Sequence, residues 1–169
     1  MKYKFKTKPY THQLEALKRS WNKQEYAYFM EMGTGKSKVL IDNIAILYDK
    51  GGIDAAIIVA PKGVYRNWSE KEIPAHMPDH VLRHVGVWSP APNRKQKKDL
   101  VKLFDTTHDL KILVINVEAF STKKGVAFVE KFILAHNALI AVDESTTERI
   151  CFEMCNKKYN PTNQETRTC

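Results

Sequence analysis

The sequence predicts an α/β domain whose mainly parallel sheet is covered by helices on both faces. Apolar runs at residues 55–60, 111–116 (apolar between Lys111 and Asn116) and 138–142 indicate strands buried on both sides, because a one-sided sheet alternates apolar and polar residues instead. Segments with apolar residues at helical spacing separate these runs. Alternation of strands and helices along one chain is typical of an open, mainly parallel sheet.

The helices are expected where apolar residues recur every three or four positions. One such pattern runs from Thr11 to about Gln24, and another starts at Lys36 and ends at the glycine pair Gly51-Gly52, which is a common helix stop. Further helices are expected at residues 64–76, 93–104 and 124–135, with a short strand near residues 81–87.

The most specific feature is a glycine-rich turn at residues 30–37, between an aromatic run and a helix. Residues 26–29 suit a strand, and strand, glycine loop and helix is the order of a phosphate-binding loop. Backbone N–H groups and the helix dipole of such a turn face phosphate. The predicted nucleotide contacts are Gly33, Thr34, Gly35, Lys36 and Ser37. Met30 replaces the first glycine of the strict pattern, so an ordinary glycine-rich connection stays open as an alternative.

Within this loop, Lys36 supplies charge to the outer phosphates and the Ser37 hydroxyl a ligand for magnesium. Two adjacent carboxylates, Asp143 and Glu144, end the last apolar run, and ligands of a parallel sheet gather at the carboxyl ends of its strands. There one acid can hold magnesium and the other can orient or deprotonate a water. A solvated strand end or a helix cap also produces paired acids, but the glycine loop favours the nucleotide site.

Composition and charge narrow the class of protein. The net charge of +8 suggests a polyanionic partner such as nucleic acid, although many solvated surfaces are basic. No apolar run has the length of a membrane span, and the first residues lack the apolar core of a secretory signal, so we expect a cytoplasmic protein without a membrane partner. The cysteines all lie beyond residue 150 without a nearby histidine, which argues against a zinc site.

In their order along residues 9–146, these motifs resemble those of the first RecA-like domain of superfamily 2 helicases and translocases. The similarity is to DEAD/DEAH-like and chromatin-remodeller-type ATPases, phage-encoded members especially, whose setting is the cytoplasm of a bacterium or an infected host. Residues 29–37 resemble motif I, which in this group often lacks the first glycine. Residues 142–146 resemble motif II, with Ser145-Thr146 in place of the more familiar Ala-Asp or Ala-His.

The resemblance implies a three-layer RecA-like domain over residues 1–146 that binds ATP and Mg²⁺. Ser37 and Asp143 would hold the magnesium, while Lys36 and Glu144 would be the catalytic residues. Residues 9–13 resemble the Q motif, whose glutamine contacts adenine. That role falls to Gln13, which would otherwise be one more exposed helical residue.

Two further segments resemble parts of the family's nucleic-acid track. Residues 57–63 resemble motif Ia, which implies backbone contacts by Pro61 and Lys62, independent of base sequence. Asn116, in the next such segment, would contact nucleic acid or simply close a strand. We expect Trp68, which follows motif Ia, to pack on the sheet.

Residues 147–169 are expected to form an irregular or disordered tail, and the family's motif III and second RecA-like lobe with its arginine finger are not recognisable. The implied function is the ATP-binding lobe of a helicase or translocase, with DNA favoured over RNA and a second lobe supplied in trans. The alternatives are a truncated or frameshifted fragment that binds nucleotide or nucleic acid without hydrolysis, and a basic nucleic-acid-binding module with a vestigial nucleotide site.

Overall fold

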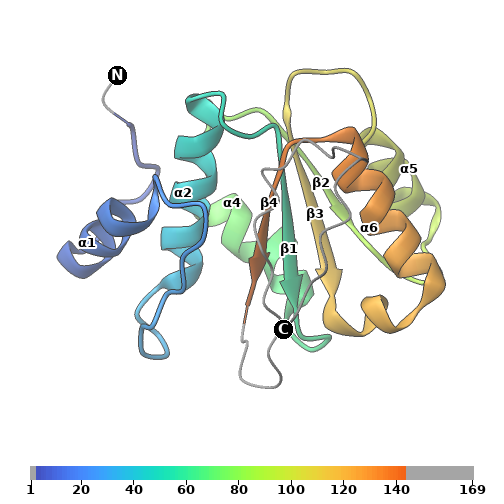
Figure 1. The fold of residues 1–169 in the computed structure, drawn as a ribbon, viewed down its shortest axis with the longest axis horizontal. Helices are drawn as coiled ribbons and strands as arrows, with labels where there is room; N and C mark the ends of the chain where they lie inside the picture. The colour runs from blue at the N-terminus through green and yellow to red at the C-terminus, as the bar shows by residue number, and fades with distance from the viewer. Residues whose placement is uncertain (1–2, 144–169) are drawn as a thin grey trace, which may run out of the picture.

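The computed structural model describes residues 3–143, which form a parallel sheet between two layers of helices (Figure 1). The sheet has four strands in the order β2-β3-β1-β4, and each neighbouring pair is parallel. The strands are β1 (Ala55–Ala60), β2 (Arg83–Val87), β3 (Leu110–Asn116) and β4 (Ala138–Val142). The prediction of an α/β domain with a three-layer, mainly parallel arrangement is confirmed.

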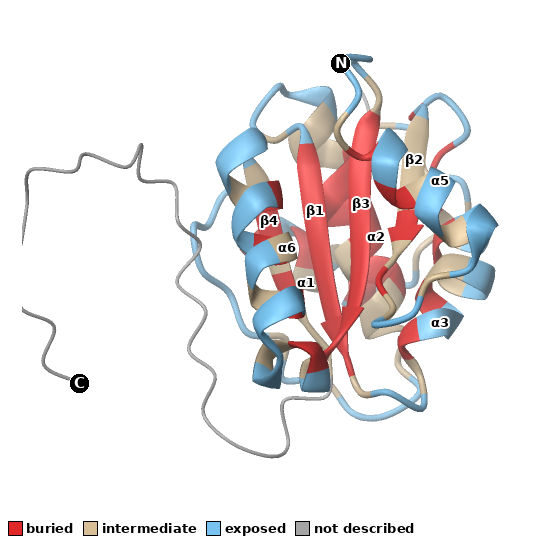
Figure 2. Cartoon of the chain, turned by 90° about the vertical axis from the view of Figure 1, so that its right-hand side faces the viewer, coloured by how far each residue is buried: buried red, intermediate tan, exposed pale blue. Residues whose placement is uncertain are grey.

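The two central strands are buried along their whole length, as their largely apolar sequences predict (Figure 2). Ile57 of β1 lies in register with Leu113 of β3 and with Ile140 of β4. The outer strands β2 and β4 are only partly buried. Burial on both faces requires apolar side chains on both sides of a strand, which is why these segments could be located from the sequence.

Each face of the sheet is covered by its own group of helices. On one face, α2 (Lys36–Asp49) and the helical segment after β1 enclose a core that includes Ile44, Trp68 and Ile73. On the other, α5 (Arg94–Lys102) and α6 (Lys123–Ala135) enclose a second core that includes Leu103 and Phe132. Outside these layers, α1 (Thr11–Ser20) packs on α2. A short 3-10 helix, η2 (Val117–Ser121), follows β3.

The helix expected over residues 64–76 contains one wide turn. Its parts are α3 (Tyr65–Asn67), the π-helix η1 (Trp68–Glu72) and α4 (Ile73–His76), which follow one another without a break. Pro74 lies just after the wide turn and cannot donate the backbone hydrogen bond of a regular helix, while its ring crowds the preceding turn. A π-turn is one of the devices that relieve such a conflict.

One predicted strand is wrong. Residues 26–29 form no strand, and within the described chain β4 pairs only with β1. The Tyr28 hydroxyl instead donates to Ser20 Oγ of α1 at 2.7 Å and accepts from Asn43 Nδ2 of α2 at 3.4 Å. Phe29 is almost fully exposed. The aromatic run therefore serves as a connection held against two helices, and α1 also ends at Ser20, earlier than expected.

The predictions for Glu144, for Ser145-Thr146 and for the tail at 147–169 concern residues outside the described part of the chain. No helix within residues 3–143 is long and apolar enough to cross a membrane.

Candidate nucleotide-binding site

The glycine loop lies at the end of the sheet toward which β1 and β4 point, at the N-terminus of α2 (Figure 1). Gly33 and Gly35 have φ angles of 77° and 82°, which side chains other than glycine rarely adopt. A Cβ atom on Gly35 would also lie 2.3 Å from Gln13 Nε2. The backbone conformation at position 35 thus favours glycine, and a larger residue there would also displace the Gln13 side chain.

The ammonium of Lys36 lies against the loop that precedes it. Lys36 Nζ donates to the carbonyl oxygens of Met30 at 2.8 Å and Glu31 at 3.2 Å. Thr34 Oγ1 donates to the same Glu31 carbonyl at 2.7 Å. The loop therefore curls around a positive charge. Because charge-assisted bonds to phosphate are stronger than bonds to neutral carbonyls, a triphosphate would compete well for this ammonium.

Gln13 is buried, 4% exposed, and both ends of its amide contact this chain's own backbone. Its Oε1 accepts from the Tyr10 N–H at 3.0 Å, and its Nε2 donates to the Thr34 carbonyl at 2.9 Å. His12 Nε2 lies 3.1 Å from the same carbonyl. Gln13 thus links α1 to the glycine loop, a role that its sequence position did not reveal. Its contact with adenine stays a prediction.

Gln13→Ala should weaken nucleotide binding by roughly five- to thirtyfold, because one or two hydrogen bonds are lost and each typically contributes about 1 kcal/mol net. ATP and GTP affinities, measured by calorimetry, separate its two roles. If Gln13 supports the loop, both nucleotides weaken equally; if it reads adenine, the preference for ATP over GTP falls. Lys18→Ala, on an exposed position of the same helix, is the matched control and should change neither affinity.

Asp143 directly follows β4 and is held at two points. Its backbone N–H donates to the Val59 carbonyl at 2.8 Å, and its Oδ2 accepts from Trp68 Nε1 at 2.8 Å. Trp68 is buried in the core beneath, so the expected packing of this residue on the sheet is confirmed. The hydrogen bond to Asp143 was not expected, because no local pattern relates two residues so far apart in the sequence.

The residues present fit a magnesium ion that is bound together with nucleotide. Ser37, in the first turn of α2, and Asp143 offer oxygen atoms, which are the ligands that this cation prefers. Residues 3–143 contain no group of three or more His, Cys, Asp or Glu side chains that could hold a metal ion alone. Mg²⁺ in nucleotide sites is usually bound through one or two protein oxygens, waters and phosphate.

The predicted nucleic-acid contacts lie at the same edge of the sheet. Pro61 directly follows β1, and Asn116 is the last residue of the adjacent strand β3. Ala60, at the end of β1, is in register with Asn116. Lys62 is exposed. The Pro61 carbonyl accepts from the N–H groups of Val64 and Tyr65 and so begins the following helix. The Asn116 amide donates to Glu118 Oε2 at 2.8 Å, so this amide already has a partner within the chain.

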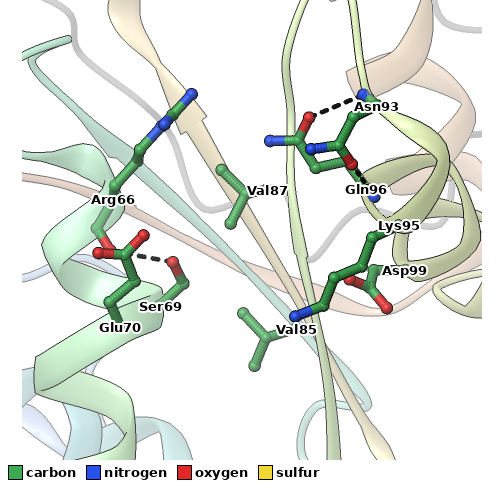
Figure 3. Close-up of a pocket in the computed structure, with 9 residues that line it drawn as sticks. All are labelled: Arg66, Ser69, Glu70, Val85, Val87, Asn93, Lys95, Gln96 and Asp99. Atoms are coloured by element: carbon green, nitrogen blue, oxygen red, sulfur yellow. Dashed lines mark hydrogen bonds between the residues drawn. The ribbon is translucent and has the colours of Figure 1, made fainter.

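A pocket of about 420 Å³ lies beside the outer strand β2, away from the glycine loop (Figure 3). Its base is formed by Val85 and Val87, and its two walls by the helix after β1 and by α5. Arg66 projects from one wall and Lys95 from the other. The basic segment at residues 93–102 therefore borders a real depression, which the sequence could not show.

These features define an ATP-binding, helicase-type lobe with a RecA-like fold. A model of the family described as type III restriction enzyme, res subunit, matches residues 6–159. The chain belongs to this family, whose domain is a DEAD/DEAH-like superfamily 2 N-terminal ATPase domain. Domains of this family generally use ATP and Mg²⁺, and membership of a helicase family implies nucleic-acid binding. No sequence of a curated protein matches the chain significantly.

Proposed function

We propose that this chain is the lobe of a DNA helicase or translocase that binds and hydrolyses ATP, and that hydrolysis drives nucleic-acid movement when a second lobe is present. The observation that carries the proposal is the placement of the glycine loop and Asp143 at one edge of the sheet, with Lys36 already at the loop. DNA is favoured over RNA, in the cytoplasm of a bacterium or a phage-infected host.

Each residue of the site has a distinct part in this reaction. The loop amides and Lys36 hold the phosphates, and the Lys36 ammonium exchanges the Met30 and Glu31 carbonyls for phosphate oxygens. Ser37 and Asp143 hold magnesium, which supplies charge neutralisation at the phosphates. Glu144, which lies outside the described residues, directly follows Asp143 and is assigned to polarising the attacking water.

Nucleic acid is proposed to pass over the same edge of the sheet. Lys62 is exposed next to the end of β1, and Arg66 follows it on the helix that borders the pocket by β2. Lys95 faces this pocket from α5. Cations spread over adjacent elements suit a phosphodiester backbone, which is bound without regard to base sequence.

The test is ATP turnover, measured on this chain alone and fused to a second RecA-like lobe, with and without DNA. We expect very slow turnover by the chain alone. An arginine finger from the second lobe contributes on the order of 10³ to 10⁵ in rate, so the fusion should be faster and respond to DNA. If the fusion binds ATP and never hydrolyses it, the chain is instead a nucleotide-binding fragment without catalysis.

A variant that lacks the proposed DNA contacts tests the nucleic-acid path. Lys62→Ala, combined with neutralisation of the basic residues of α5, should remove the response to DNA while basal turnover stays the same. Lys18→Ala and Lys23→Ala remove charge around α1, on the opposite side of the molecule (Figure 1), and should leave the response unchanged. Undiminished DNA binding by the first variant would contradict the proposed path.

A further inference from the structure

The indole N–H of Trp68 donates a hydrogen bond to Asp143, the residue predicted to hold magnesium. Trp68 is only 3% exposed, and a buried indole needs an acceptor for its single N–H. Its Nε1 donates to Asp143 Oδ2 at 2.8 Å, although many carbonyl groups would satisfy the same N–H. A hydrogen bond to a carboxylate is stronger than one to a neutral acceptor, so this contact fixes the carboxylate as well as the ring.

Asp143 is thereby restrained at its backbone and at its side chain. The backbone N–H extends the pairing of β4 with β1 through the Val59 carbonyl, which places the Cα atom. The indole then selects which way the carboxylate turns. Within the described chain Oδ2 accepts the hydrogen bond from Trp68 and no residue donates to Oδ1, so Oδ1 is the oxygen left for a ligand.

The support for Trp68 comes from the sheet itself. Trp68 is the first residue of the π-helix, and its carbonyl accepts from the Ile73 N–H. Its ring belongs to the core between the sheet and α2, with Ile58 of β1 and Val114 of β3 in the same cluster. A donor on such a rigid base can hold a carboxylate in one orientation more reliably than an exposed, flexible side chain.

We propose that Trp68 is a positioning residue that orients the Asp143 carboxylate toward magnesium, an inference that rests on the proposed function of this site. Hydrogen-bond partners behind metal ligands typically contribute 10- to 100-fold in metal affinity. Trp68→Phe removes the N–H and keeps an aromatic ring in the core. It should weaken the binding of Mn²⁺, used as a probe for Mg²⁺, to the complex of the chain with ATP by about tenfold.

The experiment measures free Mn²⁺ by electron paramagnetic resonance, and ATP binding without metal by calorimetry. A positioning role predicts weaker Mn²⁺ binding with unchanged metal-free ATP affinity, whereas a general loss of structure would weaken both. Trp88→Phe, which changes a buried tryptophan in the core on the other face of the sheet, is the matched control and should bind Mn²⁺ normally. Normal Mn²⁺ binding by a folded Trp68→Phe variant would overturn the inference.

A second measurement does not depend on the folding of the Trp68 variant. The Asp143→Asn substitution should shift the Trp68 indole N–H resonance upfield in an ¹⁵N spectrum, because a neutral acceptor replaces a carboxylate, while the Trp21 and Trp88 resonances stay in place. An unmoved Trp68 resonance would refute the hydrogen bond. If the unmodified chain binds neither ATP nor Mn²⁺ with ATP, the proposed function fails; if it binds both and Trp68→Phe has no effect, only the positioning role fails.

Discussion

Lys36→Ala is expected to lower the affinity for ATP by roughly 10- to 150-fold without changing the fold. A hydrogen bond to a charged group contributes about 1.5 to 3 kcal/mol, and each 1.4 kcal/mol corresponds to a factor of ten. Lys36 Nζ already lies on the glycine loop, bonded to the carbonyls of Met30 and Glu31. Only a short rearrangement is needed for it to meet phosphate, so its loss should act on binding directly.

The measurement is calorimetric titration of ATP into the variant, with circular dichroism to confirm the fold. Lys36→Met keeps the aliphatic stem and separates the loss of charge from the loss of packing; it should resemble Lys36→Ala. Lys124→Ala removes the same charge from an exposed position on α6 and should bind ATP normally. An unchanged ATP affinity in both Lys36 variants would show that nucleotide does not bind at the glycine loop.

The two central strands could be located from the sequence because both are buried on both faces. The error at residues 26–29 has the same origin, since an aromatic run is typical of a strand wherever it lies. This run is held in place by hydrogen bonds of the Tyr28 hydroxyl with Ser20 and Asn43. These bonds depend on how α1 and α2 pack. Sequence patterns describe one element at a time and cannot supply them.

In the candidate site, too, some residues could be predicted from local patterns and others only from the packing of distant segments. Gly33, Gly35, Lys36 and Asp143 could be named from local motifs, because each motif determines its own backbone conformation and chemistry. The partners behind them could not, because the hydrogen bonds from Gln13 to the Thr34 carbonyl and from Trp68 to Asp143 join distant segments. The candidate site residues are thus visible in the sequence, whereas their hydrogen-bond partners from distant segments become visible only in the fold.

Lys111 is another case in which a strand residue has a partner that the sequence does not reveal. It lies within the apolar strand β3, and its side chain is only 2% exposed. Its Nζ donates to Asp105 Oδ1 at 2.8 Å and also contacts Thr107 Oγ1. Hydrogen bonds from Lys111 and then from Thr107 hold the pKa of the Asp105 carboxyl well below its usual range. The buried Lys111 ammonium thus depends on one carboxylate in the connection that precedes β3.

Asp105→Ala should therefore lower the melting temperature by on the order of 10 °C, because an ammonium in the core loses its counter-charge. The comparison background is Lys111→Met, which keeps the aliphatic stem and removes the charge. This substitution should itself change the melting temperature little, since replacing a buried charge with an apolar side chain is often neutral for stability. On that background Asp105→Ala should have little effect. An equal effect on both backgrounds would show that Asp105 stabilises its loop independently of Lys111.

The pH dependence follows from the lowered pKa of Asp105. A carboxyl group whose pKa is lower in the folded state favours folding above its unfolded pKa, which is about 3.9, and loses that contribution as the pH falls through the folded value. The difference in melting temperature between the unmodified chain and Asp105→Ala should thus be constant from pH 8 to about pH 5 and shrink below about pH 4. A difference that disappeared near neutral pH would assign the effect to another group, because a carboxylate held by Lys111 stays ionised there.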